Sequence, residues 1–299
     1  MAANLYKQSE INIYKTWGYM TLFFIFVIAV GWIASYFFES YLILWIALIY
    51  SVLASFFGYW YSDKIVLKMV NAKMIEKNDN PELYLLVENL CIGAGLPLPK
   101  IYIIEENQPN AFATGRNPEH GVIAVTRGLL EVLDRSELEG VIAHELAHIG
   151  NRDALLQTIV VILFGVVVFT ADIFIRSVFW GGISKRDEKG GGLIIIAAIF
   201  FAFFAGLCAQ LMKLAISRKR EYLADSSGAL LTRYPEGLAK ALIKISNNPS
   251  TMKKASNSTS HLFIINPFKG EEKKSFFHAL FLTHPPVEKR VKALRGMNI

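Results

Sequence analysis

Two histidines and a glutamate stand together near the middle of the chain, in the run His144-Glu145-Leu146-Ala147-His148. In a helix, residues four apart lie one turn apart on the same face, so His144 and His148 can bind one metal ion. Glu145 lies beside them, and its carboxylate can take a proton from a water molecule. This H-E-x-x-H arrangement is typical of zinc sites that hydrolyse peptide bonds. We therefore expect one zinc ion per subunit, held by these two histidines and a third ligand.

A hydrolytic zinc site has three protein ligands and leaves one position for water. Glu221 is the candidate that we favour, because in a helix it shares a face with Asp225, one turn away. One carboxylate can then bind the metal, while the other accepts a hydrogen bond from the outer nitrogen of a ligand histidine. An exposed, charged helix is the other interpretation of this stretch. The remaining histidines stay open as ligands: His120, His261, His278 and His284.

The residues before the histidines predict the helix that carries them. Ser136 followed by Glu139 fits a capping box, and Asp134 and Glu137 add negative charge where a first turn favours it. Apolar residues recur at helical spacing through the rest of the stretch. We therefore expect a helix over residues 136–149.

Composition points to a membrane protein. Hydrophobic residues make up 53% of the 299 residues, and the mean hydropathy is +0.37, both above the usual values for a soluble domain. The uncharged runs Trp17–Phe38 and Tyr41–Tyr61 are long enough to cross a bilayer and predict a transmembrane hairpin. Two later apolar runs, Ala154–Ala171 and Leu193–Met212, predict a second pair. We therefore expect four transmembrane helices.

The distribution of charged residues indicates the expected orientation of the chain in the membrane. A stretch with four lysines between residues 64 and 77 follows the second run, which indicates the cytosolic side by the positive-inside rule. His148 and Glu221 are separated by two predicted crossings, which return the chain to the side that it left. The two residues can therefore share a metal site at the cytosolic membrane face.

Two further observations exclude other classes of protein. The net charge of +6 lies beside membrane spans and no nucleic-acid motif accompanies it, so we do not expect nucleic acid as a partner. Cys91 and Cys208 form no C-x-x-C pair, so neither a disulfide framework nor a thiolate zinc site is supported.

The soluble segments predict a mainly α fold with a small β-sheet. Short β-prone runs occupy residues 101–104, 110–114 and 122–126, and the last two read as a hairpin. An edge strand can hold a peptide substrate by adding it to the sheet. The candidates for that edge are Asn110, Ala111, Phe112 and Ala113, and an ordinary hairpin arm is the alternative. Helices are expected at residues 81–94, 221–231, 237–246 and 286–295.

These elements divide the chain into four expected parts. Residues 1–61 form the N-terminal transmembrane hairpin, and residues 62–152 form the first part of the catalytic domain, ending with the H-E-x-x-H helix. Residues 153–216 form the second transmembrane pair. Residues 217–299 return to the catalytic domain with the third zinc ligand.

Three segments together resemble the HtpX-type membrane metallopeptidases, with the CAAX prenyl proteases as more distant relatives. They are the H-E-x-x-H run, Ser217 to Asp225, and His284-Pro285-Pro286 through Arg290. The resemblance implies a zincin-like metallopeptidase domain, facing the cytosol of a multi-pass cell-membrane protein. It implies zinc ligands at His144, His148 and Glu221.

The same resemblance assigns roles to the residues around the metal. It makes Glu145 the general base and later the acid, and it makes Asp225 a supporting carboxylate. His284 and Arg290 match a pair near the cleft, where His284 helps to hold the developing oxyanion. The run from Asn110 to Ala113 matches the substrate-side strand.

The resemblance implies a zinc-dependent endopeptidase in quality control, acting on damaged membrane proteins or unfolded polypeptides. A CAAX-type prenyl-protein protease shares the chemistry and remains an alternative. A non-catalytic membrane scaffold with a vestigial metal site is a second alternative. An intramembrane peptidase is disfavoured, because the motif lies on a charged helix outside the apolar runs. The oligomeric state is not indicated by the sequence.

Overall fold

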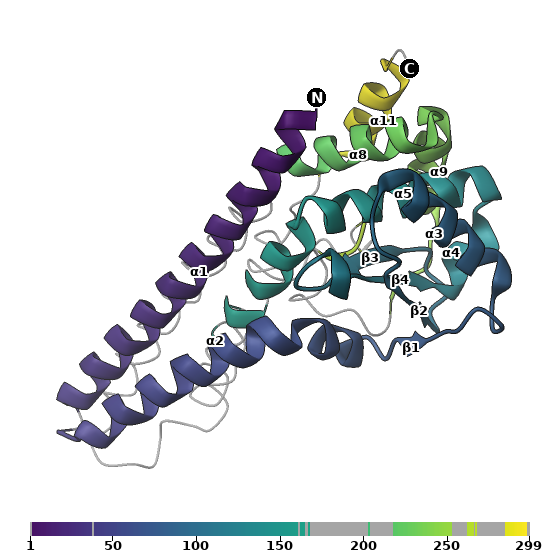
Figure 1. Cartoon of the computed structure of the whole chain (residues 1–299). Helices are drawn as coiled ribbons and strands as arrows, with labels where there is room; N and C mark the ends of the chain where they lie inside the picture. Colours follow the sequence, from purple (N-terminus) through teal and green to yellow (C-terminus); the bar gives the residue numbers. More distant parts are fainter. Residues whose placement is uncertain are drawn as a thin grey trace.

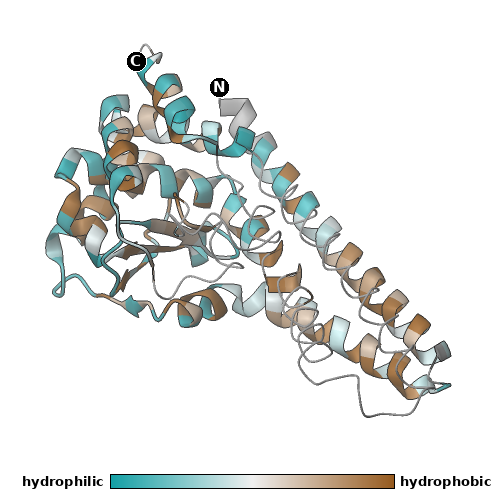
Figure 2. Ribbon diagram, turned by 180° about the vertical axis from the view of Figure 1, so that it is seen from behind, coloured by the Kyte–Doolittle hydropathy of each residue, from teal (hydrophilic) through white to brown (hydrophobic). Residues whose placement is uncertain are grey.

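Two long helices, α1 (Ala2–Phe37) and α2 (Tyr41–Met69), run side by side as an arm that projects from the rest of the protein (Figure 1). The computed structural model describes residues 2–37, 39–160, 162–164, 167, 203, 218–252, 262–265, 267 and 285–297. Both helices of the arm are long and apolar enough to cross a membrane. Hydrophobic residues dominate the far part of the arm (Figure 2), and Trp32 and Trp45 are more than half exposed there.

The arm contains both apolar runs of the predicted hairpin, but its helices extend beyond them, and α1 begins at Ala2 rather than at Trp17. α2 continues past Tyr61, so Lys64 and Lys68 lie on its last turns rather than after it. The described helical residues 153–160 and 162–164 begin one residue before the third predicted run and pack on α1 around Phe23. Of the remainder of that run only residue 167 is described, and of the fourth run only residue 203.

A four-stranded mixed sheet lies below the helical part of the protein in Figure 1. The strand order is β1-β2-β4-β3, with β2 and β4 parallel and the other pairs antiparallel. The antiparallel pair β3–β4 confirms the predicted hairpin, and the short 3₁₀ helix Pro118–His120 lies in its connection. The strands are β1 (Lys73–Met74), β2 (Lys100–Ile104), β3 (Ala111–Thr114) and β4 (Val122–Thr126).

Both faces of the sheet are buried. Side chains alternate along a strand, so Ile123 and Val125 of β4 join the core under the helices. Their neighbour Ala124 points to the other face, where it packs with Phe112 and with Val66 from the end of α2. The arm is therefore anchored directly beneath the sheet.

Besides the arm and the helical residues from Asp153 on, six α-helices belong to the described part of the body, which confirms a mainly α fold with a small sheet. α5 is the central one, because it packs against α3, α8, α9 and β3. The helices are α3 (Pro81–Ala94), α4 (Arg127–Val132), α5 (Arg135–Gly150), α8 (Arg218–Thr232), α9 (Pro235–Asn247) and α11 (Val287–Arg295).

The predicted cap of the central helix is wrong by two residues. Asp134 is the N-cap of α5: its side chain accepts a hydrogen bond from the Glu137 backbone N–H at 2.9 Å, and Glu137 accepts one from the Asp134 backbone N–H at 2.9 Å. Ser136 lies inside the first turn and donates to Asp134 instead. Both pairs have the spacing of a capping box, but the backbone is still extended at Asp134, so the earlier pair forms it.

Candidate metal centre

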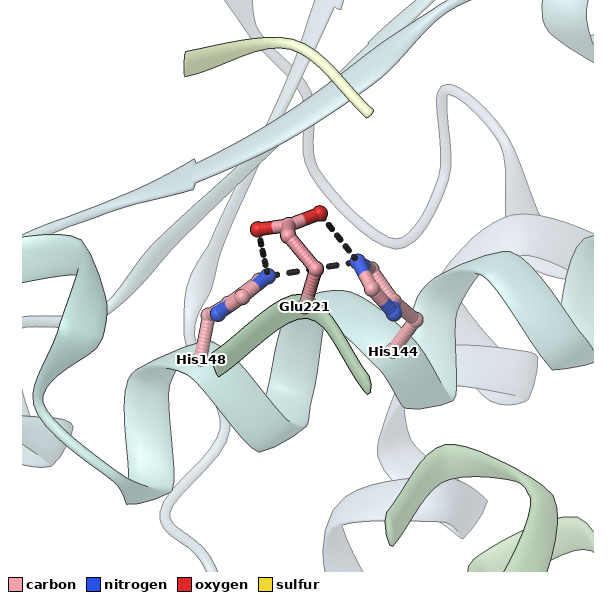
Figure 3. Close-up of side chains that lie close together, drawn as sticks. All are labelled: His144, His148 and Glu221. Carbon is pink, nitrogen blue, oxygen red and sulfur yellow. Dashed lines mark hydrogen bonds and ion pairs between the residues drawn. The ribbon is translucent and has the colours of Figure 1, made fainter. Parts of the chain in front are cut away.

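His144 and His148 of α5 and Glu221 of α8 point at one another (Figure 3). The two Nε2 atoms lie 3.2 Å apart. Glu221 Oε1 lies 3.5 Å from His148 Nε2, and Glu221 Oε2 lies 3.9 Å from His144 Nε2. All three side chains are buried. The two helices thus bring three donor atoms to one point.

This arrangement fits zinc. Bonds of about 2.0–2.1 Å in a tetrahedron place neighbouring ligand atoms about 3.3 Å apart, close to the separations seen here. Two imidazole nitrogens and a carboxylate that converge in this way give a cation between them a favourable electrostatic position. Two nitrogens and a carboxylate also form the donor set of a catalytic zinc site, and one donor atom from each residue lies within 4.8 Å of the other two.

A close approach of backbones brings Glu221 to the histidines. Gly228 lies two turns further along α8 than Glu221 and contacts α5 at Ala143 and His144, in the C-terminal half of that helix. A Cβ at Gly228 would lie 2.9 Å from the backbone nitrogen of His144, closer than side chains pack. Only glycine therefore lets α8 lie this close to α5.

A buried ion pair stands behind His144. Arg290 of α11 donates from Nε and Nη2 to the two carboxylate oxygens of Asp225, at 2.8 and 2.6 Å. Asp225 Oδ1 also lies 3.0 Å from His144 Nδ1, although it lies off the direction of a ring N–H, so the contact is mainly electrostatic. The Arg290 Nη1 lies 3.7 Å from Glu221. Arg290 therefore contributes positive charge to both carboxylates.

Burial and these charges set the protonation states of Asp225 and His144. Burial alone would raise the pKa of Asp225, but Arg290 and His144 lower it to about 2, so this carboxylate is charged at neutral pH. Burial lowers the pKa of His144 in spite of Asp225, which favours the neutral imidazole that a metal requires.

A second carboxylate stands behind His148, and the sequence interpretation missed it. Asp153 Oδ2 lies 3.3 Å from His148 Nδ1, and Asp153 is fully buried. Burial would lower the pKa of His148, but Asp153, Glu221 and Glu145 raise it to about 9. The only signal in the sequence was a carboxylate five residues after the second histidine. It becomes a neighbour because the chain turns sharply at Arg152, whose φ is 57°.

Glu145, the predicted general base, is buried beside the ligands. Burial and the charge of Glu221 raise its pKa to about 7, while His148 and Arg290 act in the opposite direction. It accepts a hydrogen bond from the Ala113 backbone N–H of β3. A carboxyl group with a pKa near neutrality can both take up and release a proton.

The predicted substrate strand lies at one edge of the described sheet, next to Glu145. The register pairs Ala111 and Ala113 with β4 so that their backbone N–H and C=O groups point away from β4, to the other side of β3. Part of that side is taken by the chain itself: the Ile264 N–H donates to the Ala111 carbonyl at 2.9 Å. Asn110 is buried, and its side chain donates to the Ile265 carbonyl.

The alternative histidine ligands do not join the described cluster. His120 is exposed in the hairpin connection, where it contacts Asn117 and Arg116. His261, His278 and His284 lie outside the described residues, so the predicted role of His284 is not placed.

Comparison with known proteins adds an independent line of evidence. The model of "Peptidase family M48" matches residues 77–298. A "Protease HtpX homolog" of Thermoanaerobacter pseudethanolicus is 41% identical over 300 residues, covering 99% of this chain and 98% of the relative. One from Pyrococcus furiosus is 47% identical over 252 residues, covering 84% and 85%. The crystal structure of S. mikatae Ste24p aligns with 98% of this chain and 67% of its own, at 19% identity and a TM-score of 0.49.

Proposed function

The chain belongs to peptidase family M48, among the HtpX-type membrane zinc metallopeptidases, and on that premise we propose how its residues divide the work. His144, His148 and Glu221 hold the zinc, and Glu145 is the general base and then the general acid. The observation that carries this assignment is the convergence of three buried donor atoms beside a fourth buried group, the separate carboxylate of Glu145. The family and the donor set make the chain an enzyme rather than a scaffold.

Each step of peptide hydrolysis has a residue of this chain in reach. When bound, zinc supplies a Lewis acid that polarises the scissile carbonyl and lowers the pKa of a water. Glu145 takes the proton of that water as it attacks, and then delivers the proton to the leaving amine. The charges of Arg290 and Asp225 hold His144 and Glu221 in place during these steps.

The side of β3 that faces away from β4 is proposed to receive the substrate. The Ala111 N–H and carbonyl are hydrogen-bonded to Asn110 and Ile264 in this structure, so an extended peptide pairs here by displacing those contacts. It then runs past Glu145, whose carboxylate the Ala113 N–H reaches. Backbone pairing reads no particular side chain, which suits unfolded polypeptides. Quality control of damaged or misassembled membrane proteins is therefore the role that we propose.

The arrangement in the membrane is part of the same proposal. The two apolar helices of the arm and two further crossings within residues 153–216 place both parts of the catalytic domain, 62–152 and 217–299, on the cytosolic face. The lysines at the end of α2 support this orientation. A zincin-like domain at the surface of the bilayer would meet substrates as they leave it.

The test uses the purified full chain in detergent with an unfolded membrane protein as substrate. We expect zinc-dependent cleavage that a chelator abolishes and added zinc restores. Glu145→Gln should keep its zinc and lose at least ~100-fold in rate, because general acid–base catalysis contributes about that much or more. Glu139→Gln, on an outer face of the same helix, is the matched control. Cleavage by Glu145→Gln at the wild-type rate would show that another group is the base, and preference for a prenylated peptide would favour the CAAX-type alternative.

A further inference from the structure

The N-terminal part of α1 reaches the metal centre through one buried side chain, Asn12. This residue is fully buried, and it lies just before the uncharged run that begins at Trp17. Its Nδ2 donates to the Asn151 carbonyl at 2.9 Å and to Asp153 Oδ1 at 2.7 Å. Only the amide nitrogen can donate twice, so these two acceptors fix the orientation of the carboxamide.

Asp153 receives contacts from three elements at once. Asn12 of α1 donates to Oδ1, and Arg220 of α8 places its Nε 3.2 Å from the same oxygen. The other oxygen, Oδ2, lies 3.3 Å from Nδ1 of His148. Arg220 directly precedes the ligand Glu221 in the sequence. The Asp153 carboxylate is thus the point where the membrane arm and both ligand-bearing helices meet.

We propose that α1 is a positioning element of the metal centre, with Asn12 and Asp153 acting as a relay to His148. Asn12 fixes the Asp153 carboxylate, and the carboxylate holds the His148 Nδ1–H, which leaves the His148 Nε2 lone pair facing the metal. The two hydrogen bonds of Asn12 go to Asn151 and Asp153, the residues on either side of Arg152, and so also hold the turn at Arg152. This inference rests on the proposed ligand set.

Packing alone does not account for the polar contact. α1 already packs on the body through Phe23 and Met20, which join Leu156 and Ile159 in one apolar cluster. A leucine of similar size at position 12 would fit an apolar contact without any buried amide to satisfy. The pairing of Asn12 with a carboxylate therefore needs another reason, and the orientation of His148 supplies it.

The test measures zinc release from the full chain in detergent, by competition with a chelator, and the ligand-field spectrum of the cobalt-substituted protein. Asn12→Ala and Asn12→Leu should both release zinc about tenfold faster, because residues that orient a ligand histidine change metal affinity by ~10–100-fold. The control is Thr16→Val, which removes a buried hydroxyl one turn along α1 that bonds only the Asn12 carbonyl within the described residues. It should release zinc at the wild-type rate.

A double variant distinguishes a relay from two separate effects. The Asp153 carboxylate offers Oδ1 to Asn12 and Oδ2 to His148, whereas an asparagine at position 153 keeps an acceptor oxygen at only one of these two places. Asp153→Asn should therefore speed zinc release by itself, and adding Asn12→Leu should change the rate no further. The cobalt spectrum should shift in each single variant and stay the same from Asp153→Asn to the double variant.

Several results would overturn the relay. One is a wild-type release rate in Asn12→Leu, which would mean that filling the space suffices and that Asn12→Ala acts through packing. Another is a double variant that releases zinc faster than Asp153→Asn does alone. The thermal midpoint of the metal-free protein reports whether each variant is folded. The ligand set is tested separately, because its failure would appear as full zinc content in Glu221→Ala.

Discussion

The two histidines of the proposed zinc site are supported from different regions of the molecule. His144 has Asp225 behind it, and Asp225 is held by a bidentate pair with Arg290, all within the helices over the sheet. His148 has Asp153 behind it, and Asp153 is held at the junction with the membrane arm. One support lies within the body and the other lies at the contact between the body and helix α1.

The difference lies in how each carboxylate is neutralised. Arg290 places two aligned hydrogen bonds on Asp225. Arg220 makes a single ion pair of 3.2 Å with Asp153 without an aligned hydrogen bond, and its Nη2 has no hydrogen-bond partner within the described residues. Bidentate pairs are the stronger kind. The support of His144 should therefore contribute more to stability, and the support of His148 should respond more to changes in the arm.

The largest effect on zinc content is expected at Glu221, the proposed third ligand, which lies beside both histidines. Glu221→Ala should lower the zinc content from about one per chain to near zero, because a hydrolytic site depends on three protein ligands. Elemental analysis after dialysis measures it. Glu236→Ala removes an exposed carboxylate on α9 that pairs with Arg295 and serves as the control. Full zinc content in Glu221→Ala would place the third ligand elsewhere in the chain.

The next effect separates the two supports. Arg290→Ala leaves the buried Asp225 carboxylate without its charge partner, and breaking such a pair costs about 3–5 kcal/mol of unfolding free energy. Arg220→Ala leaves Asp153 with Asn12 and His148 as partners, so the expected loss is only about 1–2 kcal/mol. Urea unfolding of the metal-free proteins measures both. Equal losses would remove the distinction between the two supports.

The part of the site that depends on the spacing of residues within one helix could be predicted from the sequence. His144 with His148 and Glu221 with Asp225 are each four residues apart, so each pair shares one helix face whatever the rest of the fold does. The strands over residues 101–104 and 122–126 and the helix over 81–94 were found for the same reason. These elements depend on neighbours in sequence.

The other part depends on contacts that no local pattern encodes. Asn12 and Asp153 are 141 residues apart in sequence, and no residue pattern in α1 predicts that Asn12 contacts Asp153. Asp153 also needs the left-handed turn at Arg152, a conformation that arginine rarely adopts. Arg290 was assigned through the family resemblance alone. β1 was missed because it has two residues, and pairing with β2 rather than propensity creates it.

Unfolding at acid pH should reveal how much the charged Asp225 carboxylate contributes to the stability of the metal-free protein. Its pKa is about 2 in the folded protein, below the ordinary value of 3.8, so its stabilisation is fully present above pH 4 and is lost as the pH falls toward 2. A depression of this size corresponds to about 2 kcal/mol. The measurement is the difference in unfolding free energy between wild type and Asp225→Asn, both metal-free, from pH 5 to pH 2. That difference should shrink across this range, and a constant difference would mean that the Arg290 pair does not act through the charge of Asp225.

The smallest effect tests the turn that brings Asp153 back to His148. Arg152 and Arg233 both have a positive φ, 57° and 52°, and a side chain in that region costs about 1–2 kcal/mol. Glycine removes that cost but adds backbone freedom to the unfolded chain, so Arg152→Gly and Arg233→Gly should each stabilise the metal-free protein by about 0.5–1 kcal/mol. Both substitutions remove one positive charge, which makes them matched controls.

Their effect on the metal should nevertheless differ. The turn at Arg152 fixes Asp153 against His148, whereas Arg233 follows the end of α8, away from the ligands. A more flexible backbone at residue 152 leaves the carboxylate less fixed, so Arg152→Gly should release zinc about twofold faster while Arg233→Gly matches the wild type. Chelator competition measures both rates. If the two variants release zinc alike, the strained turn serves only to connect two helices, and the support of His148 must come from Asn12 and Arg220 alone.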